Sequence, residues 1–352
     1  MSSIPTLPGI RSQMVATDRL QTHVLSCGPE DGTAVFFIHG NVSSATFWEE
    51  TMLALPAGFR AIAPDIRGYG DSQALPLDAT MGLDDVAEDI HSLAQTLGLA
   101  HYHMVGHSLG GNVAMKYALK YPATLLSLTL VATGSPYGFG GTKGLDGQPV
   151  ADDGAPAGGG GANPEFVRLL AEKYREADNP TAPINVMRQF YFKPPFTPAR
   201  EQDLLSSMLA IQTGSEFYPG DFVASANWPG MAPGTKGPLN ALAGKHYNAS
   251  GLAHIDPKPP ILWIRGEVDQ IVANGSLFDL ATLGSLGAVP GWPGAEICPP
   301  QPMIDQTRAV LEAYAAEGGR YREVVLADAG HTPYIEKPEE FNEAFHALLM
   351  GG

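Results

Sequence analysis

The stretch HMVGHSLGGN, residues 103–112, places a serine between two glycines where an apolar run ends and a helix-like run begins. Gly106, Ser108 and Gly110 form the pattern G-x-S-x-G, in which His107 precedes the serine. A turn this tight between a strand and a helix admits only small neighbours, and the glycines supply them. The serine oxygen would stand above the sheet edge at a helix N-terminus, where the helix dipole favours developing negative charge. We therefore predict that Ser108 is a nucleophile.

The segments around this turn alternate between strand and helix patterns. Continuous apolar runs are typical of strands buried on both faces, and apolar residues at helical spacing mark 83–97 as a helix. Strands that alternate with helices predict a doubly wound, mostly parallel α/β sheet of about eight strands. The predicted strands are 20–27, 34–40, 59–66, 102–107, 125–133, 259–269 and 321–331, and the other predicted helices are 108–121, 303–316 and 337–350.

The alternation breaks within 135–258, where glycine, proline and aromatic residues dominate. We expect this segment to be a helical, Gly/Pro-rich cap inserted into a core formed by 1–134 and 259–352, because long insertions in compact domains are usually functional or disordered. Within the cap, 138–164 is expected to be a flexible or irregular loop. Further expected segments are helices at 164–177 and 199–212 and a second irregular insertion within the core at 274–302.

Acidic residues outnumber basic ones, with 37 Asp+Glu against 21 Lys+Arg and a formal net charge of −16. This balance opposes binding to nucleic acid and to anionic membrane surfaces.

The N-terminal stretch lacks a secretory pattern, and no apolar run is long enough to span a membrane. The only cysteines are Cys27 and Cys298, for which two free thiols in a reducing compartment are expected. We therefore expect a cytoplasmic protein that needs no metal or other cofactor, and the sequence leaves its oligomeric state open.

A serine hydroxyl is a weak nucleophile and needs a base. His331 follows the last predicted strand, in a loop that returns the imidazole to the sheet edge where Ser108 stands. The acid that orients this imidazole is expected after the preceding strand, where Glu267 and Asp269 are the candidates. Asp269 is preferred because it lies beyond the strand end, within reach of the imidazole, whereas Glu267 lies closer to the strand.

Acyl transfer also needs hydrogen-bond donors that already point at the developing oxyanion. Leu109, directly after the serine, offers one backbone N–H. The loop that begins at His39 offers the second, and Asn41 is the expected main-chain donor. His39 itself is expected to shape this loop rather than to act as a base.

Taken together, these motifs resemble those of the α/β-hydrolase fold superfamily. The resemblance covers 20–133 and 259 to the C-terminus, is highly specific for the superfamily, and is weak for any one substrate. The chain departs from it in its long cap and in the wide separation of the candidate acid and histidine. The motifs that carry it are HG-x at 39–41, D-x-R-G-x-G-x-S at 65–72, G-H-S-L-G-G at 106–111, G-E-x-D at 266–269 and G-H-T-P at 330–333.

The resemblance and the candidate site imply a serine hydrolase that cleaves a carboxylic ester or lactone of a hydrophobic small molecule through an acyl-enzyme. Ser108 argues against branches that resemble haloalkane dehalogenases and epoxide hydrolases, which use Asp at this position. Carbon–carbon bond or amide hydrolysis and peracid formation use the same triad, and a triad-containing small-molecule receptor is another alternative. The aromatic insertion favours a hydrophobic substrate. The residues expected to line the pocket are Trp48, Phe139, Phe192 and Trp228.

Overall fold

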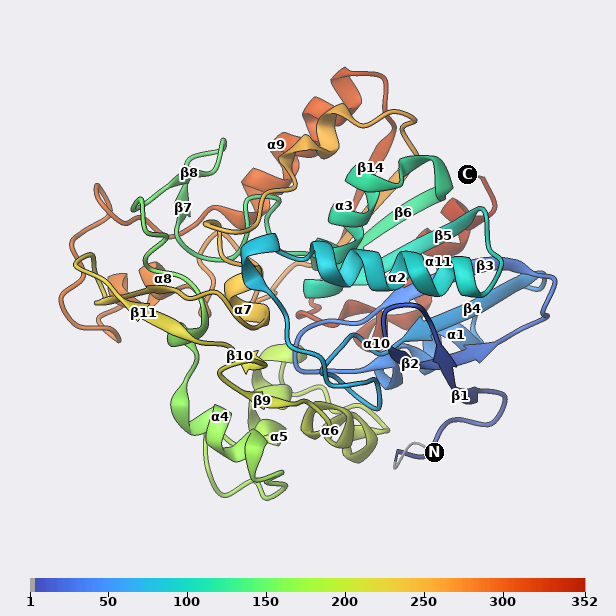
Figure 1. Cartoon of the computed structure of the whole chain (residues 1–352), viewed down its shortest axis with the longest axis horizontal. Coiled ribbons are helices and arrows are strands. Elements are labelled where there is room, and N and C mark those ends of the chain that lie inside the picture. Colours follow the sequence, from blue (N-terminus) through green and yellow to red (C-terminus); the bar gives the residue numbers. More distant parts are fainter. Residues whose placement is uncertain (1–3, 352) are drawn as a thin grey trace.

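The centre of the protein is an eight-stranded sheet, seen in a computed structural model that describes residues 4–351 (Figure 1). Its strand order is β1-β2-β4-β3-β5-β6-β13-β14. Strand β2 runs antiparallel to both of its neighbours, and the strands from β4 to β14 run parallel to one another. The predicted α/β class and mostly parallel sheet are confirmed. The strands are β1 (Arg11–Ala16), β2 (Gln21–Cys27), β3 (Thr33–Ile38), β4 (Phe59–Pro64), β5 (Tyr102–His107), β6 (Leu125–Val131), β13 (Ile261–Gly266) and β14 (Tyr321–Leu326).

Helices cover both faces of the sheet because successive side chains of its central strands point to opposite sides. In β3, Phe36 and Ile38 belong to the core shared with α2 and α3, whereas Val35 and Phe37 belong to the core shared with α1 and α11. Figure 1 shows α2 and α3 in front of the sheet and α11 behind it. The sheet is therefore doubly wound, as predicted. The helices of this core are α1 (Glu49–Leu53), α2 (Asp84–Thr96), α3 (Leu109–Lys120), α9 (Met303–Ala316), α10 (Pro333–Glu336) and α11 (Pro338–Leu349), with the 3₁₀ turns η1 (Ala45–Trp48), η2 (Ala79–Met81) and η3 (Pro122–Thr124).

The edge strand β1 was not expected from the sequence. It pairs antiparallel with β2 from Arg11 to Ala16, and every residue in it except Val15 is exposed. A strand that buries almost nothing carries no apolar periodicity, which is the signal used for the other strands. Its main chain pairs with β2, and one of its side chains contributes, since Ser12 Oγ lies 2.8 Å from His23 Nε2.

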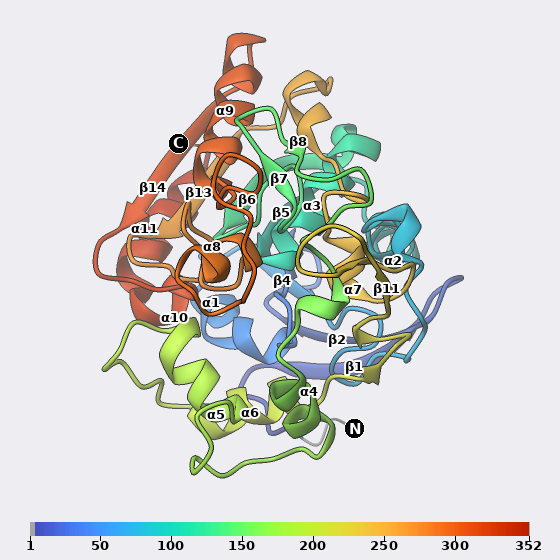
Figure 2. The same ribbon diagram turned by 90° about the vertical axis from the view of Figure 1, so that its left-hand side faces the viewer.

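The segment between β6 and β13 interrupts the alternation where the sequence predicts it. It lies to one side of the sheet, on the left in Figure 1 and toward the viewer in Figure 2, and none of its strands joins the central sheet. Its role as a cap stays a prediction. Its elements are β7 (Thr142–Lys143), β8 (Gln148–Pro149), η4 (Gly159–Gly161), α4 (Pro164–Ala171), α5 (Pro183–Val186), the π-helix η5 (Met187–Tyr191), α6 (Glu201–Leu209), β9 (Thr213–Gly214), β10 (Tyr218–Pro219), β11 (Phe222–Ala224), β12 (Met231–Pro233), α7 (Pro238–Ala241) and η6 (Ser250–His254).

Several sequence-based boundaries need correction. The strands predicted at 259–269 and 321–331 end at Gly266 and Leu326, before Asp269 and His331. The helix predicted at 164–177 ends at Ala171, because Lys173 adopts a left-handed φ of 54° and the chain turns away. The helix predicted at 199–212 is limited to α6. The segment 274–302, predicted to be irregular, contains α8 (Leu280–Ser285), whose first turn is capped by Asp279.

The glycine-rich part of the insertion is irregular, as predicted, but it is packed rather than free. Ala155 and Gly159 are buried, and Gly159 N–H donates to the side chain of Asn240 at 2.8 Å. The Asn240 amide is fully buried and donates in turn to the carbonyl oxygens of Asp221 and Lys236. One buried amide therefore orders three separate loops, which a composition-based prediction could not anticipate.

Both cysteines, Cys27 and Cys298, are buried and free, which confirms the expectation of two thiols. Within residues 4–351, none of the helices combines the length and apolar character that a bilayer crossing requires. The cytoplasmic location stays a prediction.

Candidate active site

The turn after β5 holds Ser108 in a strained backbone conformation, with φ 53° and ψ −121°. The neighbouring positions have no room for a side chain. A Cβ on Gly106 would lie 2.2 Å from the carbonyl oxygen of Gly110, and a Cβ on Gly110 would lie 2.3 Å from that of Ile38. The Ser108 N–H donates to Val131 O at 2.9 Å, which anchors the turn to β6. The tight turn expected from the glycine spacing is therefore present.

Asp269 and His331, 62 residues apart in the sequence, form a buried hydrogen-bonded pair. His331 Nδ1 lies 2.8 Å from Asp269 Oδ2, and both side chains are 3% exposed. The other carboxylate oxygen accepts the N–H groups of Ile271 and Val272 at 2.8 and 3.1 Å. Asp269 is thus fixed by its own loop and directed at Nδ1. Only Nε2 of the imidazole is left to form a hydrogen bond with another group or to exchange a proton with it.

Glu267, the other candidate acid, does not take part in this pair. Its side chain is exposed and accepts the N–H of Asp328 at 3.2 Å. The two carboxylates lie two residues apart, and only Asp269 faces the imidazole. The preference for Asp269 at the end of the strand therefore agrees with the geometry.

A buried histidine joins the serine turn to the loop of His331. Nε2 of His107 lies 2.8 Å from the carbonyl oxygen of His331, and since a carbonyl can only accept, His107 donates. The centroids of the two imidazole rings are 4.8 Å apart. Burial, and then the neighbouring His331, hold the pKa of His107 well below its usual value, so this ring is neutral with its proton on Nε2.

Ser108 itself is half-buried, and its hydroxyl makes no hydrogen bond to any residue in the described range 4–351. A nucleophile and its base are often further apart without substrate than in the substrate complex. His107, the residue directly before the serine, is in contact with His331. The arrangement therefore brings a serine, an imidazole and a carboxylate to one end of the sheet.

The loop after β3 lies against the serine turn. A Cβ on Gly40 would lie 3.2 Å from Ser108 Cβ. Asn41 follows Gly40, and no acceptor within the described part of the chain takes the N–H of Asn41 or of Leu109. Two main-chain N–H groups are thus available at the positions where the sequence predicts an oxyanion site.

Two tyrosines hold Asn41, and sequence patterns assigned neither of them a role. The hydroxyl of Tyr69 donates to Asn41 Oδ1 at 2.7 Å, and the hydroxyl of Tyr191 donates to Asn41 O at 3.0 Å. Tyr69 lies within the D-x-R-G-x-G-x-S motif, and Tyr191 comes from the insertion. Contacts between residues this far apart in the chain leave no local pattern to detect.

His39 uses both of its ring nitrogens within its own loop. Nε2 accepts the Ile66 N–H at 2.9 Å, and Nδ1 donates to Gly40 O at 2.8 Å. Burial lowers its pKa, so the ring is neutral. His39 therefore has no nitrogen left for proton transfer and acts to shape the loop.

The four aromatic residues expected to line the pocket pack against different parts of the protein. Trp48 is fully buried and stacks on Tyr334 with ring centroids 4.0 Å apart, so it belongs to the core. Phe192 is 1% exposed and packs on Phe196. The pocket-lining roles of Trp48 and Phe192 stay predictions. Phe139 is partly buried against the core, and Trp228 Nε1 donates to Pro290 O at 2.8 Å, which ties the two insertions together.

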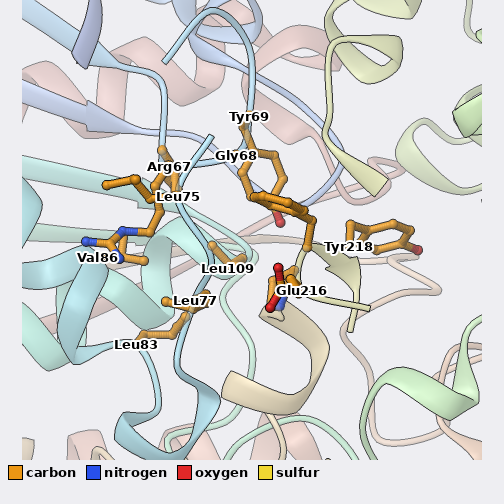
Figure 3. Close-up of a pocket in the computed structure, with 13 residues that line it drawn as sticks. Arg67, Gly68, Tyr69, Leu75, Leu77, Leu83, Val86, Leu109, Glu216 and Tyr218 are labelled. Atoms are coloured by element: carbon orange, nitrogen blue, oxygen red, sulfur yellow. The ribbon is translucent and has the colours of Figure 1, made fainter. Parts of the chain in front are cut away.

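A small cavity lies beside Leu109, as Figure 3 shows. Its volume is about 20 Å³, which is room for about one water molecule. Leucine and valine side chains of the core gather on one side, and Glu216 and Tyr218 from the insertion lie on the other. The cavity is therefore enclosed jointly by core and insertion. Its lining residues are Ile66, Arg67, Gly68, Tyr69, Leu75, Leu77, Leu83, Val86, Leu109, Glu216, Phe217, Tyr218 and Pro238.

One cluster within residues 4–351 has the composition of a metal site, with ligand atoms of His23, Asp65 and Asp71 within 4.8 Å of one another. The ligand atoms of His23 and Asp65 already have protein partners. His23 Nδ1 lies 2.7 Å from Asp65 Oδ2, and the carboxylate also accepts the N–H groups of Ala45 and Asp71 at 2.8 and 2.9 Å. Although burial opposes ionisation, the hydrogen bond and charge of His23 hold the pKa of Asp65 below its usual value. We interpret the cluster as the anchor of the D-x-R-G-x-G-x-S loop.

Comparison with curated proteins finds local relatives. Over 105 residues the chain is 44% identical to a putative carbamate hydrolase of Variovorax paradoxus, covering 30% of this chain and 39% of that protein. Over 120 residues it is 33% identical to an epoxide hydrolase of Siraitia grosvenorii, covering 34% of this chain and 37% of that protein. The chain thus spans less than two fifths of the length of either relative.

Solved structures match over almost the whole chain. An esterase from Exiguobacterium antarcticum has a TM-score of 0.61 at 18% identity, with 97% of this chain and 100% of that one covered. A carboxylesterase from Bacillus subtilis has a TM-score of 0.59 at 17% identity, with 97% and 92% covered. Identities this low show a shared fold only. The family model described as the alpha/beta hydrolase fold matches residues 33–287, and the chain belongs to this family.

Proposed function

We propose that this protein is a serine hydrolase that cleaves a carboxylic ester or lactone of a hydrophobic small molecule. The observation that carries the proposal is the buried His331–Asp269 pair, which His107 holds beside the strained turn of Ser108. A serine, an imidazole and a carboxylate that act in this order perform acyl transfer on several unrelated folds.

In the first half of the reaction, Ser108 Oγ attacks the substrate carbonyl carbon while His331 Nε2 takes the hydroxyl proton. Asp269 stabilises the imidazolium that forms. The N–H groups of Asn41 and Leu109 bind the oxyanion of the tetrahedral intermediate. The carbon–oxygen bond to the alcohol then breaks, His331 returns the proton to the departing oxygen, and an ester of Ser108 remains.

In the second half, a water molecule attacks this ester while His331 Nε2 takes a proton from the water. The bond between the acyl carbon and Ser108 Oγ breaks, and His331 gives the proton back to the serine. The carboxylic acid leaves. With a lactone the alcohol and the acid are parts of one molecule, so both groups leave together at this step.

The surroundings of Leu109 support a neutral, apolar substrate. The neighbouring cavity is lined mainly by leucine, valine and aromatic side chains. The cation at its edge, Arg67, is paired with Asp89 through two hydrogen bonds of 2.6 and 2.7 Å. A substrate anion would therefore have to compete with a buried carboxylate. Because the cavity holds only about one water molecule, we expect side chains of the insertion, such as Phe217, to move when a substrate enters.

A carbamate or amide is the second candidate substrate class. It is supported by the local similarity to a putative carbamate hydrolase, and the same serine chemistry applies to that carbonyl. The similarity to an epoxide hydrolase does not favour epoxide opening, because the residue at the turn is Ser108 rather than an aspartate.

The test compares the unmodified chain with Ser108→Ala on p-nitrophenyl esters, aliphatic and aromatic lactones, and p-nitrophenyl carbamates. We expect multiple turnovers on esters or lactones by the unmodified chain and loss of at least about 10⁴-fold in kcat in the variant. Labelling with a fluorophosphonate should modify Ser108 alone. Turnover that survives in Ser108→Ala would refute the proposal, and turnover on carbamates alone would select the second class.

A further inference from the structure

Tyr191 connects three parts of the molecule that the sequence keeps far apart. It is the last residue of the π-helix η5 in the insertion, and its side chain is 7% exposed. Its hydroxyl lies 3.0 Å from Asn41 O and 3.1 Å from Val42 O, and it donates to this pair of carbonyls. Among residues 4–351, no other group donates to either of these carbonyl oxygens.

The main chain of Tyr191 holds the other side of the site. Its carbonyl oxygen accepts the N–H of Thr332 at 2.9 Å, directly after His331. Its ring packs edge-on against the His331 imidazole, with centroids 6.3 Å apart, and also contacts Phe47. One residue of the insertion therefore touches the Asn41 loop through its hydroxyl and the His331 loop through its backbone and ring.

The conformation of the Asn41 loop needs such support. Val42 has φ 47°, which is unfavourable for a β-branched residue and persists only where the surroundings impose it. Holding the carbonyls of Asn41 and Val42 fixes the two peptide planes on either side of the Val42 Cα, and with them the strained torsions of Val42. The first of these planes begins at the Asn41 Cα, so the hydroxyl also restrains the residue that carries the candidate N–H donor. Burial raises the pKa of Tyr191, so its hydroxyl stays protonated and keeps donating.

We propose that Tyr191 is a positioning residue, which aims the Asn41 N–H at the oxyanion and keeps the His331 loop against the Ser108 turn. This inference rests on the proposed serine hydrolase function. The insertion therefore takes a direct part in the geometry of the reaction. The site is complete only when η5 contacts both the Asn41 loop and the His331 loop.

The test uses Tyr191→Phe, which removes the hydroxyl and keeps the ring and the main-chain bond. The matched control is Tyr247→Phe. Tyr247 also lies in the insertion, is 1% exposed, and donates its hydroxyl to a backbone carbonyl, Asn112 O, at 2.8 Å. Each variant loses one buried tyrosine hydroxyl that donates to main-chain carbonyl oxygen, so the thermal unfolding temperature should fall in both.

Two readouts separate positioning from stability. The first is kcat and KM on the p-nitrophenyl ester that the unmodified chain hydrolyses fastest. The second is the second-order rate of phosphonylation by a fluorophosphonate, in which Ser108 Oγ displaces fluoride from phosphorus and His331 takes the serine proton. Both reactions develop negative charge on an oxygen that the Asn41 N–H would bind. Both are measured well below the unfolding temperature of every variant.

We expect Tyr191→Phe to lower kcat and the phosphonylation rate by about 10- to 100-fold while KM changes less than about 2-fold. Tyr247→Phe should stay within about 2-fold of the unmodified chain in all three quantities. Equal rates in the two variants, or a change in KM alone, would overturn the role of Tyr191 while leaving the serine hydrolase intact. Undiminished turnover in Ser108→Ala would instead overturn the proposed function, and this inference with it.

Discussion

His331 Nδ1 and Asp269 Oδ2 lie 2.8 Å apart in a buried pair, and the remaining oxygen of Asp269 is held by two main-chain N–H groups. The carboxylate is therefore fixed before any substrate arrives. A base whose tautomer and orientation are set in advance loses no time or free energy to reorganisation during the reaction. Because Asp269 is held in this way and Glu267 is exposed, experiments can separate the roles of these two carboxylates.

Asp269→Asn should lower kcat by about 10⁴-fold, because an amide at this position favours the wrong tautomer of His331 and cannot stabilise the imidazolium. The measurement is steady-state hydrolysis of a p-nitrophenyl ester. The matched control is Glu267→Gln, two residues away and exposed, which should retain kcat. Comparable losses in the two variants would contradict the assignment of Asp269 as the acid.

His107→Leu should lower kcat by about 10- to 100-fold, because the His331 carbonyl loses its donor and the histidine loop is free to shift. His107→Gln places an amide N–H near the position of Nε2 and should recover most of the loss. The readout is kcat together with the unfolding temperature. If the leucine and glutamine variants are equally impaired, the bond from Nε2 to the carbonyl oxygen is not what positions the loop.

Gly110→Ala should lower the free energy of unfolding by about 1 to 3 kcal/mol, because the added Cβ has no space beside the Ile38 carbonyl. Gly275→Ala is the control, since a Cβ there would meet no atom within 4 Å. Urea denaturation of both variants measures the difference. Equal stability would show that the serine turn relaxes more easily than its geometry indicates.

His103 should make the stability of the protein fall in acid. Its imidazole is buried with Nδ1 2.7 Å from Ser127 Oγ, and burial lowers its pKa from 6.5 to about 4. Between these values the unfolded chain binds a proton that the folded chain does not, so the contribution of His103 is complete above pH 6.5 and is lost as the pH falls toward 4.

The corresponding variant is His103→Asn, whose side chain can still donate toward Ser127. It should reduce the slope of unfolding free energy against pH by up to about 1.4 kcal/mol per pH unit in this range. Urea denaturation across a pH series measures the slope, with His101→Asn at an exposed position as the reference variant. An unchanged slope in His103→Asn would mean that His103 is protonated in the folded protein.

The sheet and the serine turn were predictable from sequence because their causes are local. Glycines on both sides of Ser108 are required by contacts within the turn and with the adjacent strand, and continuous apolar runs mark strands buried on two faces. The exposed strand β1 has no such signal and was missed. Asp269 and His331 were located because each follows a strand that ends at the same edge of the sheet.

The sequence by itself determined the α/β class, the turn that strains Ser108, and the strand ends from which Asp269 and His331 arise. Only the tertiary structure decided which aromatic residues are core, how Asn240 orders the glycine-rich loop, and that Tyr191 joins the Asn41 and His331 loops. The physical reason is the separation along the chain of the residues that restrict one another. A tight turn or a buried strand restricts residues within a few positions of one another. A hydrogen bond across 150 residues restricts only the folded arrangement and leaves no periodicity in the chain.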